Sequence, residues 1–280
     1  MNEMTTDFIK RSIEEDIGEG DITSIACIDN TTLGKAQLIT KENCKIAGVE
    51  LVKNIYSFYD KNLHFSPCCK DGENLKKGNV VFELSGNQRS ILATERLVLN
   101  CMQRMSGIAT KTQKFIRKIK DLNTIILDTR KTCPSIRFLD KEAVKIGGAN
   151  NHRKGLYDTV MIKDNHIDFA GGIENAIIRS EQYLKNNKLT KIKVIIEVRS
   201  LKELNTVLRF GKINRILLDN FSVQKTKQAV KIVNKKYPLE TSGNITLNNV
   251  RDYAMCGVDY ISIGNLTHSI KNIDLSMTCI

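Results

Sequence analysis

The spacing of hydrophobic positions changes near residue 95 and divides the chain into two regions. Before that point, short apolar runs at 36–40 and 80–86 are separated by clusters of Gly, Asn and Asp, which is typical of short strands joined by turns. A helix that ends near Asp16 precedes them. Residues 1 to about 95 therefore predict a small α+β unit.

From Glu95 onward, apolar residues recur at three- and four-residue spacings and predict one long helix, with Leu97, Cys101, Met105, Ile108, Phe115 and Ile119 on its buried face. Six runs with the length and composition of buried strands follow, at 124–130, 159–165, 193–199, 215–220, 237–243 and 260–265. Strands and helices thus alternate through the second region.

Helix ends can be identified between these strands. Ser200 and Glu203 predict a capping box, and Gly211 closes that helix. Ser222 begins another helix, and a third lies between Thr246 and Gly257. Continuous apolar strands joined by helices indicate a parallel sheet covered on both faces, either a barrel or a doubly wound sheet. No GxGxxG follows a strand, which favours the barrel.

Composition agrees with a folded, soluble protein. The 280 residues suffice for one large or two small domains at about 150 residues each. Hydrophobic residues make up 41% and charged residues 26% of the chain, near globular averages. The acidic N-terminus does not resemble a signal peptide, and no apolar stretch reaches the roughly 18 residues of a membrane span. We expect a cytoplasmic protein that does not bind membranes.

The eight cysteines form no CxxC pair, and most lie within apolar runs, so we expect reduced thiols in the core. The chain carries a formal charge of +12, and residues 101–165 hold 14 basic against 6 acidic residues. Such a basic region suits nucleic acid, anionic lipid or a small polyanionic substrate, although a solvated basic face is an equal alternative on charge alone.

Polar residues stand at the ends of all six predicted strands. In a barrel these ends converge on one pocket, the usual place of the active site. The strand ends comprise residues 128–131 (Asp-Thr-Arg-Lys, with Thr129), 163–166 (Lys-Asp-Asn-His), 197–199 (Glu-Val-Arg), 219–220 (Asp-Asn), 242–244 (Ser-Gly-Asn) and 263–265 (Ile-Gly-Asn).

The predicted pocket has a cationic side and an acidic side. Carboxylates and phosphates are suitable ligands for the cationic side, which comprises Arg130, Lys131, Lys163, His152 and Arg153. Glu197 and Asp219 can hold Mg²⁺ or accept hydrogen bonds from sugar hydroxyls, or each can form a buried salt bridge with Arg130 or Lys163. The Ser-Gly-Asn and Ile-Gly-Asn turns can offer backbone N–H groups to a phosphate, although glycine there can also serve the backbone alone.

The four histidines do not have the spacing of a metal site. We expect His152, beside Arg153, to lie in the pocket, His64 and His268 to be structural, and His166 to be a turn residue. No cysteine has an evident base beside it, which argues against thiol catalysis. The residues alone therefore predict a Mg²⁺-assisted enzyme that acts on a phosphorylated sugar and a second, anionic substrate.

These strings resemble the nicotinate-nucleotide pyrophosphorylase (carboxylating) family, also called quinolinate phosphoribosyltransferases. The matching runs occur in the family's order over nearly the whole chain and are EEDIGEGDITS (14–24), ATERLVLNCMQRMSGIAT (93–110), LDTRKTCPSIR (127–137), KEAVKIGGANNHRKGLYDTVMIKDNHI (141–167), LLDNFS (217–222), ETSGNIT (240–246) and VDYISIGNLTHS (258–269).

The resemblance implies an α/β fold in which an N-terminal α/β sandwich domain, residues 1–103 completed by 266–280, accompanies an irregular open α/β barrel of the type II phosphoribosyltransferase kind, residues 104–265. It also implies a homodimer with shared active sites. The implied reaction joins quinolinate to 5-phosphoribosyl 1-diphosphate with Mg²⁺ and gives nicotinate mononucleotide, diphosphate and CO₂, a step of NAD synthesis.

By motif, the resemblance implies that the two carboxylates of quinolinate contact Arg130, Arg153 and Lys163, joined by Arg96 of the partner subunit. Lys131 and His152 would line the same side. Glu197 and Asp219 would face the ribose hydroxyls and the metal, and the phosphate would be held by Ser242, Gly243, Asn244, Ile263, Gly264 and Asn265. Asn244, Ala149, Ser135 and Arg199 depart from the pattern expected of the family.

Three other functions compete with this interpretation. A paralogous branch associated with molybdenum transport shares the fold, but the intact NHR and KDNH strings argue against it. A phosphoribosyltransferase that uses nicotinate is possible, although four bases favour a doubly charged acid. The third alternative is a nucleic-acid-binding protein. The carboxylates beside the basic residues argue against it, because they would repel a phosphate backbone.

Overall fold

The computed structural model describes all residues, 1–280, and they form two compact units. The first unit comprises residues 1–113, 133–148 and 269–280, and the second comprises 114–132 and 149–268. The sequence placed residues 104–113 and 133–148 in the barrel domain, whereas their contacts lie in the first unit. One reason is the hydrogen bond from the Ala47 N–H to Ser106 Oγ at 3.0 Å, which ties 104–113 to the first unit, while the ion pair between Arg104 Nε and Asp140 Oδ1 at 2.7 Å ties 133–148 to the same segment.

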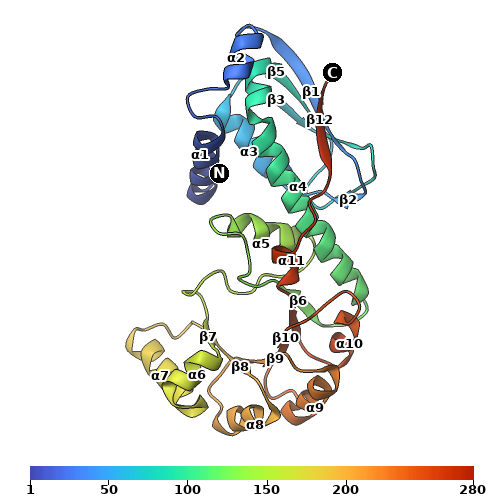
Figure 1. Cartoon of the computed structure of the whole chain (residues 1–280). Helices are drawn as coiled ribbons and strands as arrows, with labels where there is room; N and C mark the ends of the chain where they lie inside the picture. The colour runs from blue at the N-terminus through green and yellow to red at the C-terminus, as the bar shows by residue number, and fades with distance from the viewer. The chain divides into compact units, whose positions relative to one another are not determined.

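The first unit is built on a four-stranded antiparallel sheet in the order β12-β1-β5-β3 (Figure 1). Its strands are β1 (Leu33–Thr40), β3 (His64–Pro67), β5 (Val80–Asn87) and β12 (Leu275–Cys279), and a separate two-stranded ladder joins β2 (Cys44–Lys45) to β4 (Asn74–Leu75). β12 pairs with β1 from Ala36 opposite Cys279 to Thr40 opposite Leu275. The C-terminal tail therefore completes the sheet, as predicted.

Helices accompany this sheet, namely α1 (Glu3–Asp16), α2 (Ile22–Cys27), α3 (Val49–Tyr59), α5 (Arg137–Ile146) and the long α4 (Gln88–Lys118), which continues into the second unit. α3 packs on the sheet through Tyr56, whose ring lies 5.9 Å from that of Phe82 on β5. The sequence predicted α1 correctly but placed the start of α4 at Glu95 and did not identify α2, α3 or α5. Val, Ile, Tyr and Phe dominate α3 and favour strands, so local preference conceals this helix.

The second unit contains a six-stranded parallel sheet in the order β6-β11-β10-β9-β8-β7. The strands are β6 (Ile125–Leu127), β7 (Val160–Ile162), β8 (Val194–Val198), β9 (Arg215–Asp219), β10 (Leu239–Ser242) and β11 (Tyr260–Ser262). All six predicted strands are confirmed. They curve into a ring that stays open between β6 and β7, since these edge strands do not pair (Figure 1).

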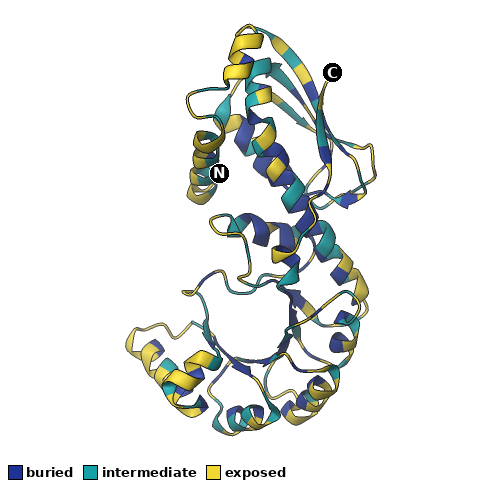
Figure 2. Cartoon of the chain, in the orientation of Figure 1, coloured by how far each residue is buried: buried dark blue, intermediate teal, exposed yellow.

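Helices cover the outside of this ring, and the strands themselves are largely buried (Figure 2). The helices of this layer are α6 (Asp164–Ala170), α7 (Ile173–Asn186), α8 (Leu201–Phe210), α9 (Val223–Val233) and α10 (Val250–Met255), and the short α11 (Asn265–His268) follows β11. All five residues of β8 are buried, since both faces of the sheet are covered. Strands in this position are therefore mostly apolar along their whole length. An open parallel α/β barrel therefore forms the second unit, as predicted.

The predicted helix ends are close to the observed ones. Ser200 Oγ accepts the Glu203 N–H at 3.2 Å, while the Glu203 carboxylate turns back to the Arg199 N–H rather than to that of Ser200. Ser222 caps α9. The third helix starts later than predicted, at Val250, because a turn in which Asn249 Oδ1 accepts the Thr246 N–H occupies the residues before it.

All eight cysteines are free thiols, but the prediction that they lie in the core is wrong for most of them. Only Cys44, Cys69 and Cys101 are buried. The others lie at segment ends or in loops, where neighbouring apolar residues do not imply burial. None of the helices is both long enough and apolar enough to span a membrane.

Candidate active site

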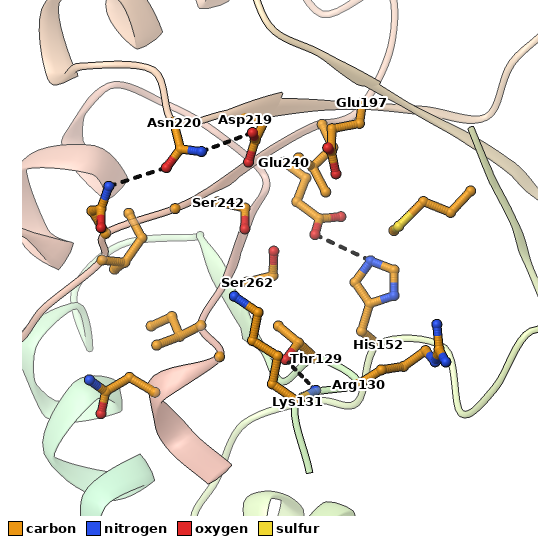
Figure 3. A pocket seen from close by; sticks show the side chains of 18 of the residues that line it. Thr129, Arg130, Lys131, His152, Glu197, Asp219, Asn220, Glu240, Ser242 and Ser262 are labelled. Carbon is orange, nitrogen blue, oxygen red and sulfur yellow. Dashed lines mark hydrogen bonds and ion pairs between the residues drawn. The ribbon is translucent and has the colours of Figure 1, made fainter. Parts of the chain in front are cut away.

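The strand ends of the second unit surround a cavity of about 650 Å³ (Figure 3). Every strand provides residues at or just after its carboxyl end, and for β7 these are Met161 and Lys163. The sequence-predicted residues in its lining are Thr129, Arg130, Lys131, His152, Arg153, Lys163, Glu197, Asp219, Ser242, Gly243, Asn244, Ile263, Gly264 and Asn265. The barrel thus brings together all but one of the predicted site residues.

Arg96 is the exception. It lies exposed on α4 in the first unit and is not among the residues that line this cavity. The sequence assigned it to the site of a partner subunit, and that assignment stays a prediction.

Positive charge is concentrated on one side of the cavity, which we call the cationic side and define as Arg130, Lys131, Arg153 and Lys163. Burial lowers the pKa of the Arg153 guanidinium, and the nearby positive charge of Arg130 lowers it further, although Asp158 and Glu197 oppose both effects. The positive charges of Arg130 and Arg153 repel each other, so an anion bound between the two guanidinium groups would be stabilised by both.

A buried carboxylate anchors the loop that carries part of this side. Asp128, fully buried at the end of β6, accepts the backbone N–H of His152 at 2.7 Å and the side-chain amide of Asn151 at 2.7 Å. Asn150 pairs with Leu127 as an isolated parallel bridge. The loop is therefore held against the free edge of β6, and Asp128 fixes the main chain directly before Arg153.

The other end of the loop is closed by Asp158. Its carboxylate accepts the N–H groups of Lys154 at 2.7 Å and Gly155 at 3.3 Å. Burial alone would raise the pKa of Asp158, but these backbone hydrogen bonds and Arg153 lower it below its ordinary value. Arg153 Nη1 also donates to the Thr159 carbonyl at 3.1 Å. The loop thus presents Arg153 in a defined position.

Glu197 and Asp219 lie at the ends of the neighbouring strands β8 and β9 and form the acidic side of the cavity, across from Arg130 and Lys131 (Figure 3). Lys163 Nζ donates to Glu197 Oε2 at 3.0 Å, so the salt bridge weighed as an alternative from the sequence does form, inside the cavity. Burial raises the pKa of Glu197 above its ordinary value even though Lys163 opposes the shift. Asp219 Oδ2 accepts from Asn220 Nδ2 at 2.9 Å.

The acidic side offers two carboxylates to a cation, and no group of three or more His, Cys, Asp or Glu side chains able to hold a metal occurs in the structure. A dedicated metal cage is therefore not present. Mg²⁺ keeps several waters and is commonly held by one or two carboxylates together with substrate phosphates. The donor set fits a Mg²⁺ ion of that kind, held by Glu197 and Asp219 in company with a phosphorylated substrate.

The Ser-Gly-Asn turn after β10 has a demanding backbone. Gly243 has φ +97°, and a Cβ there would collide with the side chain of Asn220. Asn244 has φ +53°, a left-handed conformation that asparagine adopts more readily than most residues. Its Nδ2 donates to Asn220 Oδ1 at 3.2 Å (Figure 3). After β11, Gly264 lies where a Cβ would crowd the Lys131 side chain.

The lining also contains Asn220, which the sequence placed at a strand end without a role, and residues not predicted to lie there, namely Met161, Leu217, Glu240, Ile245, Thr246, Ser262 and His268. His268, expected to be structural, is exposed and lines the cavity. His166, expected to be a turn residue, lies instead in the first turn of α6, where its Nδ1 accepts the Lys163 N–H and caps the helix. His64 lies on β3 in the first unit. One signal could have identified Glu240, because it is the only charged residue in the predicted strand YPLETSG.

The fold and the cavity define an α/β-barrel enzyme with a site for small anionic molecules at the carboxyl ends of its strands. Two family models match the chain, "Quinolinate phosphoribosyl transferase, C-terminal domain" over residues 108–278 and "Quinolinate phosphoribosyl transferase, N-terminal domain" over residues 21–106. The chain belongs to the quinolinate phosphoribosyltransferase family.

Individual relatives agree with this membership. The chain is 42% identical to a chloroplastic nicotinate-nucleotide pyrophosphorylase (carboxylating) of Arabidopsis thaliana, covering 96% of this chain and 81% of that protein. It is 38% identical to a probable nicotinate-nucleotide pyrophosphorylase (carboxylating) of Bacillus subtilis, covering 94% and 89%. The solved nicotinate-nucleotide pyrophosphorylase of Francisella tularensis superposes with a TM-score of 0.92 at 40% identity, covering 100% and 97%.

The names of several plant relatives specify a chloroplast or a mitochondrion. The cytoplasmic location expected from the sequence therefore stays a prediction for this chain.

Proposed function

We propose that this chain transfers the phosphoribosyl group of 5-phosphoribosyl 1-diphosphate to quinolinate with loss of CO₂, which gives nicotinate mononucleotide and diphosphate for NAD synthesis. Family membership supports the reaction, and the relatives named above carry this activity in their names. The observation that carries the proposal is the pairing of a cationic side with two carboxylates across one cavity.

Quinolinate carries two carboxylates on neighbouring ring atoms. Arg130 and Arg153 would bind them, because each guanidinium can donate two parallel hydrogen bonds to a carboxylate. A dianion between these groups would also relieve the repulsion that lowers the pKa of Arg153. Lys163, which already contacts Glu197, would extend the cationic side toward the reacting centre.

The phosphoribosyl substrate would occupy the acidic side and the two glycine turns. Glu197 and Asp219 would accept hydrogen bonds from the ribose hydroxyls. The turns at 242–244 and 263–265 would donate backbone N–H groups to phosphate oxygens. Lys131, whose side chain runs past Gly264, would supply a positive charge between the two substrates.

The phosphoribosyl transfer requires that the protein position the substrates and stabilise charge, and it requires no covalent intermediate with the protein. Departure of diphosphate leaves positive character on the ribose, and the basic residues stabilise the departing charge. The pyridine nitrogen of quinolinate then bonds to C1 of the sugar. When the adjacent carboxylate departs as CO₂, its bonding electron pair stays on the ring carbon, where the positive ring nitrogen stabilises it, and a proton from solvent then bonds to that carbon to give nicotinate mononucleotide.

Glu197 and Asp219 are the residues that would hold Mg²⁺. Bound there, Mg²⁺ would supply positive charge to neutralise the diphosphate. Because both carboxylates also face the place assigned to the ribose, they would serve the sugar and the cation together. The third carboxylate of the lining, Glu240, is already paired with Arg215 and lies beside His152, so it is not offered to the cation.

We also propose that two copies of the chain share their sites, with Arg96 of one copy entering the cavity of the other. Exposure of Arg96 on α4 and the family's implied homodimer support this proposal. A third arginine would hold a doubly charged acid more firmly than a singly charged one, which favours quinolinate over nicotinate.

One experiment tests the reaction directly. Purified protein is incubated with Mg²⁺, 5-phosphoribosyl 1-diphosphate and either quinolinate or nicotinate, and mononucleotide and CO₂ are measured separately. We expect product and equal amounts of CO₂ from quinolinate only. Turnover of nicotinate would show that the protein uses nicotinate rather than quinolinate alone. Turnover of neither acid would favour the branch associated with molybdenum transport.

A further inference from the structure

A charged network extends from the cavity into the interior of the barrel. Glu240 lies within β10 with its side chain 0% exposed. Its Oε2 accepts from Arg215 Nη1 at 2.9 Å, and its Oε1 lies 3.2 Å from His152 Nε2 (Figure 3). The Arg215 guanidinium rests on the ring of Tyr260, 3.8 Å from its centroid, and is not part of the cavity lining.

The other ring nitrogen of His152 is engaged as well. Nδ1 accepts the backbone N–H of Arg153 at 2.7 Å, which requires a free lone pair on Nδ1. The ring proton must then be on Nε2, the atom that faces Glu240. An ionised carboxylate only accepts hydrogen bonds, so Glu240 and this form of the imidazole are complementary.

Glu240 is held in its ionised form. Burial alone would raise the pKa of Glu240, but side-chain hydrogen bonds with His152, Ser262 and Arg215 lower it below its ordinary value. A buried charge with several hydrogen-bonding partners is costly to move, so Glu240 is a fixed point within the barrel.

We propose that Glu240 is a positioning residue that fixes His152 as a neutral imidazole with its proton on Nε2, and that this ring in turn holds the main chain of Arg153. In this arrangement His152 serves the anion site by placing the Arg153 guanidinium, and adds no positive charge of its own. From the sequence, His152 is instead predicted to belong to the cationic side of the pocket. The benefit to quinolinate binding rests on the proposed function, whereas the state of the ring does not.

Two double variants distinguish the effect of a hydrogen-bond acceptor at position 240 from the effect of a negative charge there. R215L/E240Q removes both charges and keeps a side-chain oxygen that can accept from Nε2. R215L/E240L removes the charges and the acceptor together. Replacing a buried ion pair by neutral groups is often tolerated, and removing Arg215 in both variants avoids leaving a buried cation unpaired.

Nitrogen-15 spectra of histidine side chains report the ring directly, and the His152 signals are identified by their loss in H152Q. For the wild type at about neutral pH we expect one protonated nitrogen, Nε2, and one unprotonated nitrogen, Nδ1. Hydrogen exchange of the Arg153 amide then reports whether the ring holds the main chain. We expect the leucine variant to lose this ring pattern and about tenfold of the Arg153 protection, and the glutamine variant to keep most of both.

Kinetics complete the test. The leucine variant should raise KM for quinolinate about tenfold with a smaller change in kcat, and the glutamine variant should recover most of that loss. A doubly protonated ring or a proton on Nδ1 in the wild type would overturn the proposal. So would a leucine variant that keeps the ring pattern and the Arg153 protection. A wild type inactive on quinolinate would refute the proposed reaction instead, and the spectra would still decide the state of His152.

Discussion

Lys163 Nζ lies 3.0 Å from Glu197 Oε2, so a cation from the end of β7 and a carboxylate from the end of β8 meet inside the cavity. Lys163 is substantially exposed, whereas the Glu197 side chain is only 9% exposed. The ion pair therefore reduces, but does not abolish, the free-energy cost of burying the ionised Glu197. The pKa of Glu197 stays above its ordinary value for this reason. Glu197 thus lowers the folding stability of the protein in return for a carboxylate at the proposed ligand site.

The first prediction concerns this cost. A carboxyl whose pKa is raised by folding favours the folded state at pH below its unfolded pKa, and this contribution is lost as pH rises through the folded pKa. We therefore expect E197Q to gain stability relative to the wild type as pH rises through the weakly acidic range. Activity should fall in the same variant, since the amide replaces a ligand for the sugar and the cation.

Thermal unfolding of both proteins across that pH range measures the effect. E142Q, in which an exposed glutamate of α5 is replaced, controls for the loss of one negative charge. A stability difference that shrinks as pH rises would contradict the assigned shift.

The second prediction concerns the cationic side. R130A should fold normally and bind quinolinate at least about tenfold more weakly, because a hydrogen bond to a charged group contributes about 1.5–3 kcal/mol. Calorimetry measures the affinity. R251A is a matched control, since Arg251 is an exposed arginine of the same unit that pairs with Asp121 outside the cavity. Equal affinity of R130A and the wild type would refute the assignment.

The third prediction tests sharing of sites between two copies. R96A and R130A should each be nearly inactive, and a mixture refolded together should regain about a quarter of wild-type activity, since half of the dimers are mixed and each carries one intact site. Mixing R130A with R153A should give no recovery, because both residues line the same cavity of one chain. Absence of rescue in a verified mixed dimer of R96A and R130A would exclude the shared arrangement.

The fourth prediction concerns the turn after β10. Asn244 combines a left-handed backbone with a hydrogen bond to Asn220. N244A would keep the strain and lose the hydrogen bond, whereas N244G would lose both, so we expect N244A to be the less stable by about 1 kcal/mol. Urea unfolding compares the two. Equal stabilities would show that the backbone at this position is not strained.

The barrel was predictable from the sequence because buried parallel strands require unbroken apolar runs, and β8 and β9 show this clearly. The helix caps Ser200 and Ser222 are local signals that depend on a few neighbouring residues. α3 and α5 could not be identified in the same way. The residues of α3 favour strands, and α5 joins the first unit through Asp140, which pairs with Arg104 at a distance of 36 residues along the chain.

The sequence by itself therefore determined the order of the six barrel strands and the chemical types at their ends, since both depend on local composition and spacing. Only the tertiary structure decided which of those groups contact one another. The Lys163–Glu197 pair, the anchoring of the Arg153 loop by Asp128 and the contact between Glu240 and His152 each join residues from different strands or loops. Such contacts arise when the sheet closes around its strand ends, and no local pattern along the chain encodes the distances between them.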